Sequence, residues 1–140
     1  MTEADVRGSG GKGQGVREFL LVADEVAAAL SDGRPVVALD STLISHGFPY
    51  PENLAIAHDS ETAVREQGAV PATIAIHDGR IRVGLAPDEL LSLASAHEVA
   101  KVARPTLAAA LAREGWGATT VSATMIAAHA AGIAVFATGG

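Results

Sequence analysis

Cysteine is absent from this 140-residue chain, and positive charge is scarce. The lack of cysteine excludes disulfide frameworks, thiolate zinc sites and cysteine nucleophiles, and it suits a reducing, cytoplasmic compartment. Ten Lys and Arg residues against sixteen Asp and Glu residues give a net charge of −6. The basic surface that a nucleic-acid backbone requires is therefore missing, and we expect a small-molecule ligand and no nucleic-acid partner.

The first fifteen residues lack the apolar stretch of a secretory signal and are rich in glycine. We interpret 1–15 as a flexible tail and place the start of a single compact domain, 16–140, near Val16. Residues 8–13 of the tail match a G-x-G-x-x-G pattern. No strand precedes this pattern and no close-packed helix follows at once, which favours a plain tail over a nucleotide-binding loop.

Charged side chains are absent from residues 115–140. The segment is long enough to span a membrane. Small residues dominate it, however, and His129 and Gly132 interrupt it, so insertion into a membrane would gain little free energy. We favour a buried helix followed by a buried strand, and we expect no membrane partner.

Apolar periodicity and turn residues predict alternating helices and strands. Helices are predicted over 17–30, 51–67, 87–96, 105–115 and 119–131, and strands over 35–39, 72–76, 80–85 and 133–137, with a short apolar run at 99–103. Asp78-Gly79 is typical of a two-residue hairpin turn, so the strands beside it should form the one antiparallel pair. Two prolines make 46–51 an ordered loop.

This order of elements indicates an α/β protein. The continuous apolar strands are typical of a mixed, mostly parallel sheet with helices on both faces, an α/β/α arrangement. Strand 133–137 runs into Thr138-Gly139-Gly140 with no covering helix after it. We therefore expect the sheet to be incomplete at the carboxyl-terminal end.

Asp40 stands directly after strand 35–39, at the end of a parallel strand where α/β proteins bind ligands. Partial burial would raise the pKa of its carboxyl group, which could then act as a proton donor or base. Alternatively, Asp40 only accepts hydrogen bonds from the amides of the following turn.

Lys101 is one of two lysines in the chain, and the other, Lys12, lies in the tail. Burying a lysine in the apolar V-A-K-V-A run is costly without a partner, so Lys101 should meet a carboxylate or an anionic ligand. Alternatively, 99–103 is an edge strand from which Lys101 points into water.

The histidines lack the spacing of a compact metal site, and we predict no metal ligand among them. His46, in the loop after the first strand, is the one functional candidate. Thr119, Thr120 and the Thr138-Gly139-Gly140 turn offer hydroxyls and amides that suit a phosphate, although helix capping and turn formation explain them equally well.

Six blocks of sequence, in order, carry a family resemblance over about residues 16–140. They are P-V-V-A-L-D-S-T-L-I-S-H-G from Pro35, Q-G-A-V-P-A-T-I-A-I from Gln67, V-G-L from Val83, K-V from Lys101, G-A-T-T-V from Gly117 and V-F-A-T-G-G from Val135. Together they resemble the pseudouridine-5′-phosphate glycosidases, also called the indigoidine synthase A-like family.

The resemblance implies a cytoplasmic, trimeric α/β/α enzyme that uses a divalent metal such as Mn²⁺. Such enzymes reversibly cleave the C–C glycosidic bond of pseudouridine 5′-phosphate to uracil and ribose 5-phosphate. The resemblance assigns the proton donor to Asp40 and substrate contacts to Lys101 and Val121. An acid is needed because the base must gain a proton as the bond breaks, and a cation offsets the charge of the phosphate.

Two departures from the family pattern bear on activity. The usual acid is Glu, whereas Asp40 is one methylene shorter, and a shift of ~1 Å in a catalytic group can cost about 10²-fold in rate. The family's metal-binding Asp, and its Lys that forms a Schiff base with the opened ribose, lie beyond the Thr-Gly-Gly block. We therefore expect the amino-terminal portion of a glycosidase, inactive alone. The alternative is a non-catalytic remnant or module that binds a sugar phosphate.

Overall fold

The computed structural model describes residues 14–139. The helices are α1 (Gln14–Arg17), α2 (Asp24–Ser31), α3 (Thr42–His46), α4 (Glu52–Glu66), α5 (Pro87–Ser95), the 3₁₀ helix η2 (Arg104–Thr106), α6 (Leu107–Leu111) and α7 (Val121–Ala131). The strands are β1 (Leu20–Val22), β2 (Val36–Leu39), β3 (Val70–His77), β4 (Arg80–Val83), β5 (Ala100–Val102), β6 (Trp116–Thr119) and β7 (Val135–Ala137). The G-x-G-x-x-G pattern and most of the predicted tail lie outside the described residues, and α1 includes the last two tail residues.

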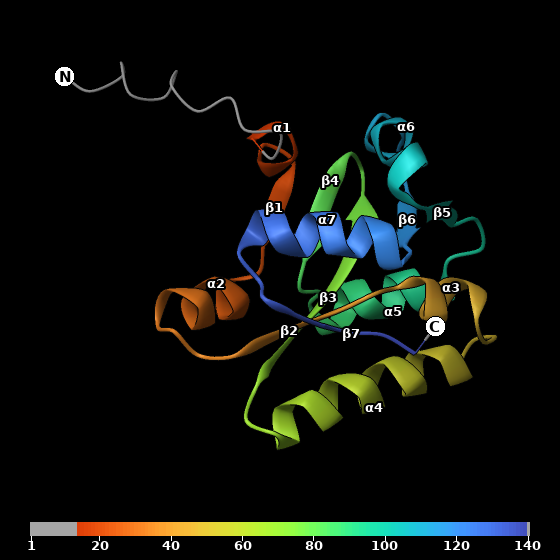
Figure 1. Cartoon of the computed structure of the whole chain (residues 1–140). Helices are drawn as coiled ribbons and strands as arrows, with labels where there is room; N and C mark the ends of the chain where they lie inside the picture. Colours follow the sequence, from red (N-terminus) through yellow and green to blue (C-terminus); the bar gives the residue numbers. More distant parts are fainter. Residues whose placement is uncertain (1–13, 140) are drawn as a thin grey trace, which may run out of the picture.

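The strands form one mixed sheet with the order β1-β4-β3-β2-β7, to which β6 and β5 are added beside β3. Pairing is parallel except where β3 meets β4 and β6. Helices α2 and α7 contribute to one apolar core, and α3, α4 and α5 to a second. Figure 1 shows α7 crossing in front of the strands and α4 running below them. The predicted α/β/α fold is confirmed.

Within residues 14–139, no helix is both long enough and apolar enough to cross a membrane. The uncharged segment instead forms β6, α7 and β7. Helix α7 ends at Gly132 in the left-handed conformation expected of a helix-terminating glycine. Strand β7 differs from the prediction of a buried strand, because Val135 is 55% exposed at the margin of the sheet.

The predicted hairpin is confirmed. Asp78 and Gly79 both have positive φ values, 47° and 77°, as a two-residue turn between β3 and β4 requires. A second antiparallel pair, β3 with β6, was not predicted. The predicted helix 105–115 is wrong beyond Leu111, since residues 112–115 form a turn that leads into the strand β6. Gly117 allows β5 to pair closely with β6, because a Cβ atom at residue 117 would lie 2.9 Å from a methyl carbon of Val102 in β5.

The predicted helix over 17–30 is confirmed from Asp24 onward and wrong in its first half. Its first half contains the strand β1, which pairs with β4 through Leu20 opposite Ile81, and α2 begins only at Asp24. Leu20 and Val22 are partly buried against the core, so tertiary pairing outweighs the helical periodicity of the sequence. The predicted loop 46–51 starts one residue later, because the short helix α3 ends at His46.

Candidate functional site

Three strands end near the middle of β3. Strand β2 runs parallel to the first half of β3, with Leu39 opposite Thr73. Strand β6 runs antiparallel to the second half, with Ala118 opposite Ala75, and β5 runs parallel to β6. The carboxyl ends of β2, β5 and β6 therefore converge, although β2 and β6 approach from opposite directions. This convergence brings together loops that are far apart in the sequence.

Buried hydroxyl groups hold the two strand ends together. The Thr119 amide donates to Ser41 Oγ at 2.9 Å, and the Ser41 amide donates to the Thr119 carbonyl at 3.2 Å. The Thr119 hydroxyl donates to the Ile74 carbonyl at 2.7 Å and accepts from the Thr124 hydroxyl at 2.8 Å. Thr119 is 1% exposed. Its hydroxyl therefore forms hydrogen bonds inside the protein. Of the predicted pair Thr119 and Thr120, only Thr120 lines the cavity described next.

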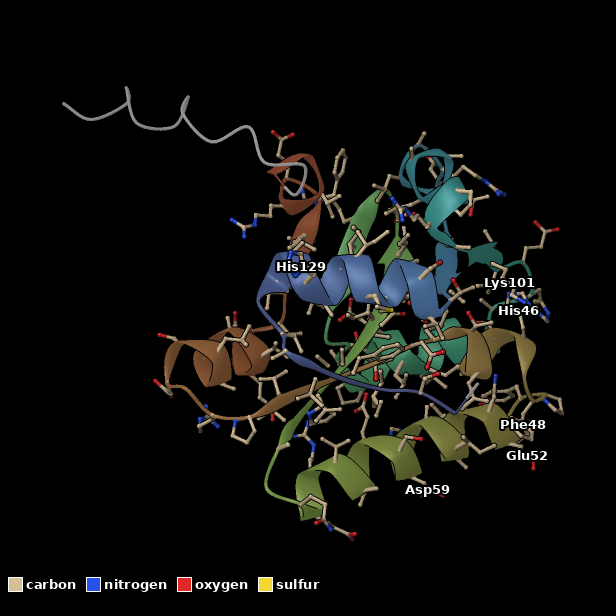
Figure 2. The ribbon with its side chains drawn as sticks, viewed as in Figure 1. His46, Phe48, Glu52, Asp59, Lys101 and His129 are labelled. Atoms are coloured by element: carbon tan, nitrogen blue, oxygen red, sulfur yellow. The ribbon has the colours of Figure 1, made fainter. Side chains whose placement is uncertain are left out.

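A cavity of about 370 Å³ opens at this convergence, and we call it the Lys101 pocket. Its lining comprises Asp40, Thr42, Leu43, His46, Gly47, Lys101, Thr120 and Val121. The three residues to which the family resemblance assigns roles, Asp40, Lys101 and Val121, thus share one cavity with His46. Figure 2 shows Lys101 and His46 near each other at one end of the molecule.

Asp40 follows β2 directly and lies between two cavities, the Lys101 pocket and an apolar one of about 300 Å³. Partial burial raises the pKa of its carboxyl group, against a smaller lowering by hydrogen bonds, one of them from Thr138. The Thr138 hydroxyl donates to Asp40 Oδ2 at 3.3 Å. The rise in pKa is the direction expected from a strand-end position. Asp40 therefore keeps its proton to a higher pH than a solvated aspartate does.

Lys101 occupies the middle of β5, which pairs with β6 alone among the described strands. Its side chain is exposed, and it forms no ion pair with any residue of 14–139. Strand β5 is therefore an edge strand, and no carboxylate partner of Lys101 occurs among residues 14–139. An exposed cation at a cavity wall remains available to an anionic ligand.

Val121 is the first residue of α7, and Thr120 is its N-cap residue. Both line the Lys101 pocket, so the amino-terminal end of an eleven-residue helix faces the cavity. That end carries a partial positive charge. With Lys101 and His46 it gives the pocket a lining suited to an anion, and Asp40 contributes the one carboxyl group of that lining.

The other polar residues that the sequence suggested lie outside the Lys101 pocket. His77 stacks on Trp116 with ring centroids 4.0 Å apart, and His58, His97 and His129 are exposed. Thr138 and Gly139 line the apolar cavity. Within residues 14–139, no three His, Cys, Asp or Glu side chains gather closely enough to hold a metal ion. The oxygen-rich donor set that Mn²⁺ prefers is therefore not assembled from the described residues.

Sequence reasoning missed Ser41 and the strand β6 as parts of the site. The sequence does indicate a role for Ser41, because Ser41 follows Asp40 directly at the end of a predicted strand. Strand β6 had almost no sequence signal. It is only four residues long, Gly115 precedes it and Gly117 lies within it.

Comparisons with known proteins show the family to which the chain is similar. The sequence profile of indigoidine synthase A-like proteins matches residues 25–140. A pseudouridine-5′-phosphate glycosidase from Rhodospirillum centenum is 62% identical over 89% of this chain and 39% of its own length. One from Glaesserella parasuis is 52% identical over 89% of this chain and 41% of its own. The chain thus spans about two fifths of the length of these curated relatives.

Two solved structures share the fold. The prealnumycin C-glycosynthase AlnA, in complex with ribulose 5-phosphate, superposes with a TM-score of 0.75 and 44% identity, over 85% of this chain and 38% of its own. An indigoidine synthase A-like protein from Thermotoga maritima gives a TM-score of 0.73 and 29% identity, over 87% of this chain and 39% of its own. Because its profile match covers most of the sequence, the chain belongs to the indigoidine synthase A-like family.

Proposed function

We propose that this chain supplies the acid and the sugar-phosphate-binding part of a C-glycosidase that acts on pseudouridine 5′-phosphate. The observation that carries the proposal is the Lys101 pocket, which places an acid of raised pKa in the same cavity as a cation that forms no ion pair with residues 14–139. The names of the relatives support the substrate. The ribulose 5-phosphate bound by AlnA supports a sugar phosphate in this fold.

In the proposed reaction, Asp40 is the proton donor to the base. The glycosidic C–C bond breaks with its electron pair on the uracil carbon, and the Asp40 proton takes the place of the sugar there. Asp40 is left as a carboxylate, and its partial burial favours regaining a proton. The sugar carbon loses that electron pair. By the family resemblance, the nitrogen of a lysine beyond the Thr-Gly-Gly block bonds to the sugar carbon in its place, and water then displaces the lysine and releases ribose 5-phosphate.

In the same proposal, Lys101 and the first turn of α7 hold the phosphate, while Val121 forms an apolar contact with the substrate. Trimeric assembly and a cytoplasmic location belong to the proposal through the family resemblance. Light scattering of the purified chain tests the trimer. Mn²⁺ does not fit the donor groups of residues 14–139, so no step here passes through it.

A covalent chimera tests the proposed function. Residues 16–140 of this chain replace the matching part of the Rhodospirillum centenum relative, and uracil release from pseudouridine 5′-phosphate is followed by chromatography. We expect release by the chimera and none by this chain alone. A folded chimera that releases no uracil would overturn the proposal. If this chain nevertheless bound ribose 5-phosphate, the alternative of a sugar-phosphate-binding module would hold.

Replacing Lys101 with Gln is expected to weaken the binding of ribose 5-phosphate to this chain. A hydrogen bond to a charged group contributes about 1.5–3 kcal/mol, so the dissociation constant should rise roughly 10- to 100-fold. Isothermal titration measures it. Arg113→Gln is the matched control, because it removes one positive charge from an exposed residue outside the pocket. Equal weakening by both variants would indicate a general charge effect and no contact at Lys101.

A further inference from the structure

One wall of the Lys101 pocket is formed by the short helix α3, which contributes two polar side chains that have no part in the reaction proposed above. Thr42 is the first residue of α3 and His46 is its last, and both line the cavity. Residues four positions apart lie on the same side of a helix. We call Thr42 and His46 the α3 pair.

The end of α3 fixes the position of His46. Gly47 follows as the C-cap residue, and a Cβ atom at residue 47 would clash with the carbonyl oxygen of Leu43. The chain therefore requires glycine to turn away directly after His46. The His46 side chain is exposed at the cavity, and Figure 2 shows it near Lys101 at the same end of the molecule. A protonated His46 thus adds a second positive charge to the pocket that contains Lys101.

The hydroxyl of Thr42 is a donor without a partner. Its oxygen atom is buried and has no hydrogen-bond partner among residues 14–139. Buried hydroxyls in proteins are paired in the large majority of cases. Threonine adopts two common rotamers in helices, so rotation about the Cα–Cβ bond redirects this hydroxyl without breaking a hydrogen bond. A ligand in the cavity would give the hydroxyl the acceptor that the described residues do not supply.

Few charged groups face His46. Lys101 and Asp40 line the same cavity. Helix α3 packs mainly against α4, α5 and β6. Strand β6 has no titratable side chain, and among the described residues no titratable side chain of α4 or α5 lines the pocket. Figure 2 shows Glu52, the first residue of α4, near Phe48 and apart from His46. His46 is therefore the one histidine of the lining, and histidine is the side chain whose charge ordinarily changes between about pH 5 and 8.

We propose that the α3 pair forms part of a phosphate site, in which the imidazolium of His46 and the hydroxyl of Thr42 donate to the oxygens of a phosphate monoester dianion that Lys101 also binds. The inference rests on the proposed function and deepens it, because it names residues that select a phosphorylated sugar over an uncharged one. A bound dianion favours the imidazolium over the neutral imidazole. Binding of the phosphate therefore draws a proton onto His46.

The affinity for a phosphate monoester should consequently fall as the pH rises and His46 loses its proton. The ligand itself works in the opposite direction. A phosphate monoester loses its second proton at a pKa of about 6, so its dianion becomes more abundant as the pH rises. A fall in affinity with rising pH thus reports a group of the protein.

Isothermal titration of the full 140-residue chain with ribose 5-phosphate, at about pH 6.5 and about pH 8.5, tests the inference. We expect the dissociation constant of the parent to rise about tenfold between the two pH values. His46→Gln should raise the constant about tenfold at the lower pH and abolish its pH dependence, because a charge-assisted hydrogen bond is lost. His46→Arg keeps a positive charge at both pH values, so it should bind more tightly than the parent at the higher pH.

Two variants serve as controls for the titration. His129 is exposed near the carboxyl-terminal end of α7, far from Lys101 and His46 in Figure 2. His129→Gln should therefore leave both dissociation constants unchanged. Asp40 also lines the cavity, and a bound anion would favour its protonated form. The pH dependence should persist in Asp40→Asn if His46 is the group that takes up the proton.

Thr42→Val tests the other member of the α3 pair. Valine has nearly the shape of threonine, and the hydroxyl that it removes has no partner among the described residues. We expect the dissociation constant to rise roughly 2- to 10-fold at both pH values, with no loss of thermal stability. A hydroxyl that serves only the fold would give the reverse, a loss of stability with unchanged binding.

The inference is overturned by equal affinity of His46→Gln and the parent at the lower pH, or by a pH dependence that Asp40→Asn removes and His46→Gln retains. Absence of ribose 5-phosphate binding by the folded parent would also overturn it. Circular dichroism verifies that each variant is folded. None of these results requires turnover, so uracil release by the covalent chimera would still support the proposed function. Conversely, an inactive chimera would leave the phosphate site to be judged by the titration alone.

Discussion

An Asp40→Asn substitution in the covalent chimera is expected to lower the rate of uracil release by roughly 10²- to 10⁴-fold, the usual contribution of a positioned general acid. Asn has nearly the same shape, and its amide oxygen can still accept the hydrogen bond from Thr138 that Asp40 accepts at 3.3 Å. The loss should therefore report the missing proton. Initial rates at saturating pseudouridine 5′-phosphate measure it.

The pH dependence of the same chimera gives a second readout. Burial raises the pKa of Asp40, so the acid stays protonated above the ordinary range for aspartate and loses its proton as the pH rises through the raised value. The rate of uracil release should therefore fall as the pH rises through that value. This fall should be missing in Asp40→Asn. A merely structural Asp40 would not give this difference.

Asp40→Asn should not lower the stability of the chimera, although it lowers the rate of uracil release. Because the folded-state pKa of Asp40 is raised, ionisation penalises the folded state above the ordinary pKa, and the penalty disappears below it. Asp40→Asn should therefore be at least as stable as the parent at neutral pH.

Asp40→Glu, which restores the acid usual in the family, should retain or increase the rate of uracil release. An Asp40→Asn chimera that keeps its rate and pH profile would remove Asp40 from the reaction.

The position of Asp40 could be predicted from the sequence, whereas the site around it could not. A short apolar strand followed by D-S-T indicates a ligand-binding strand end from local pattern alone. Lys101 and Val121 join Asp40 only because β6 lies antiparallel along the second half of β3. No local pattern signals that pairing, and these two residues were identified through the family resemblance.

The two elements that the sequence misassigned share a physical cause. The strand β1 lies in a helical pattern, and β6 lies after a predicted helix, yet both pair along strands of the central hairpin. Leu20 gains a neighbour in Ile81 of β4, and Gly117 allows β5 to approach β6 closely. In such short segments, pairing with strands that are distant in the sequence determines the secondary structure. Local propensity therefore predicts these segments poorly.

Asn53, near the start of α4, is expected to be the most important polar side chain for the stability of the pocket wall. It is 3% exposed, and its amide nitrogen donates to the Ile44 carbonyl at 2.9 Å and the Ala94 carbonyl at 2.8 Å. These carbonyls lie in the last turns of α3 and α5, where helices leave their acceptors unpaired. One side chain thus terminates two helices, and α3 carries part of the Lys101 pocket.

Replacing Asn53 with Leu would leave both carbonyls buried without a donor. Each unsatisfied group costs about 1–3 kcal/mol, so the loss of two donors should lower the free energy of unfolding by roughly 2–6 kcal/mol. Urea denaturation followed by circular dichroism measures it.

Gln67→Leu is the matched control, because it removes a similar amide from the exposed C-cap position of the same helix and should change the free energy of unfolding by less than about 0.5 kcal/mol. Under conditions where Asn53→Leu is still folded, it should also weaken ribose 5-phosphate binding, since α3 loses its link to α4 and α5. A loss of stability no greater than that of Gln67→Leu would show that α3 is held by its apolar contacts alone. Ile44 and Leu90 would be the residues to examine next, because both lie in the core shared by α3, α4 and α5.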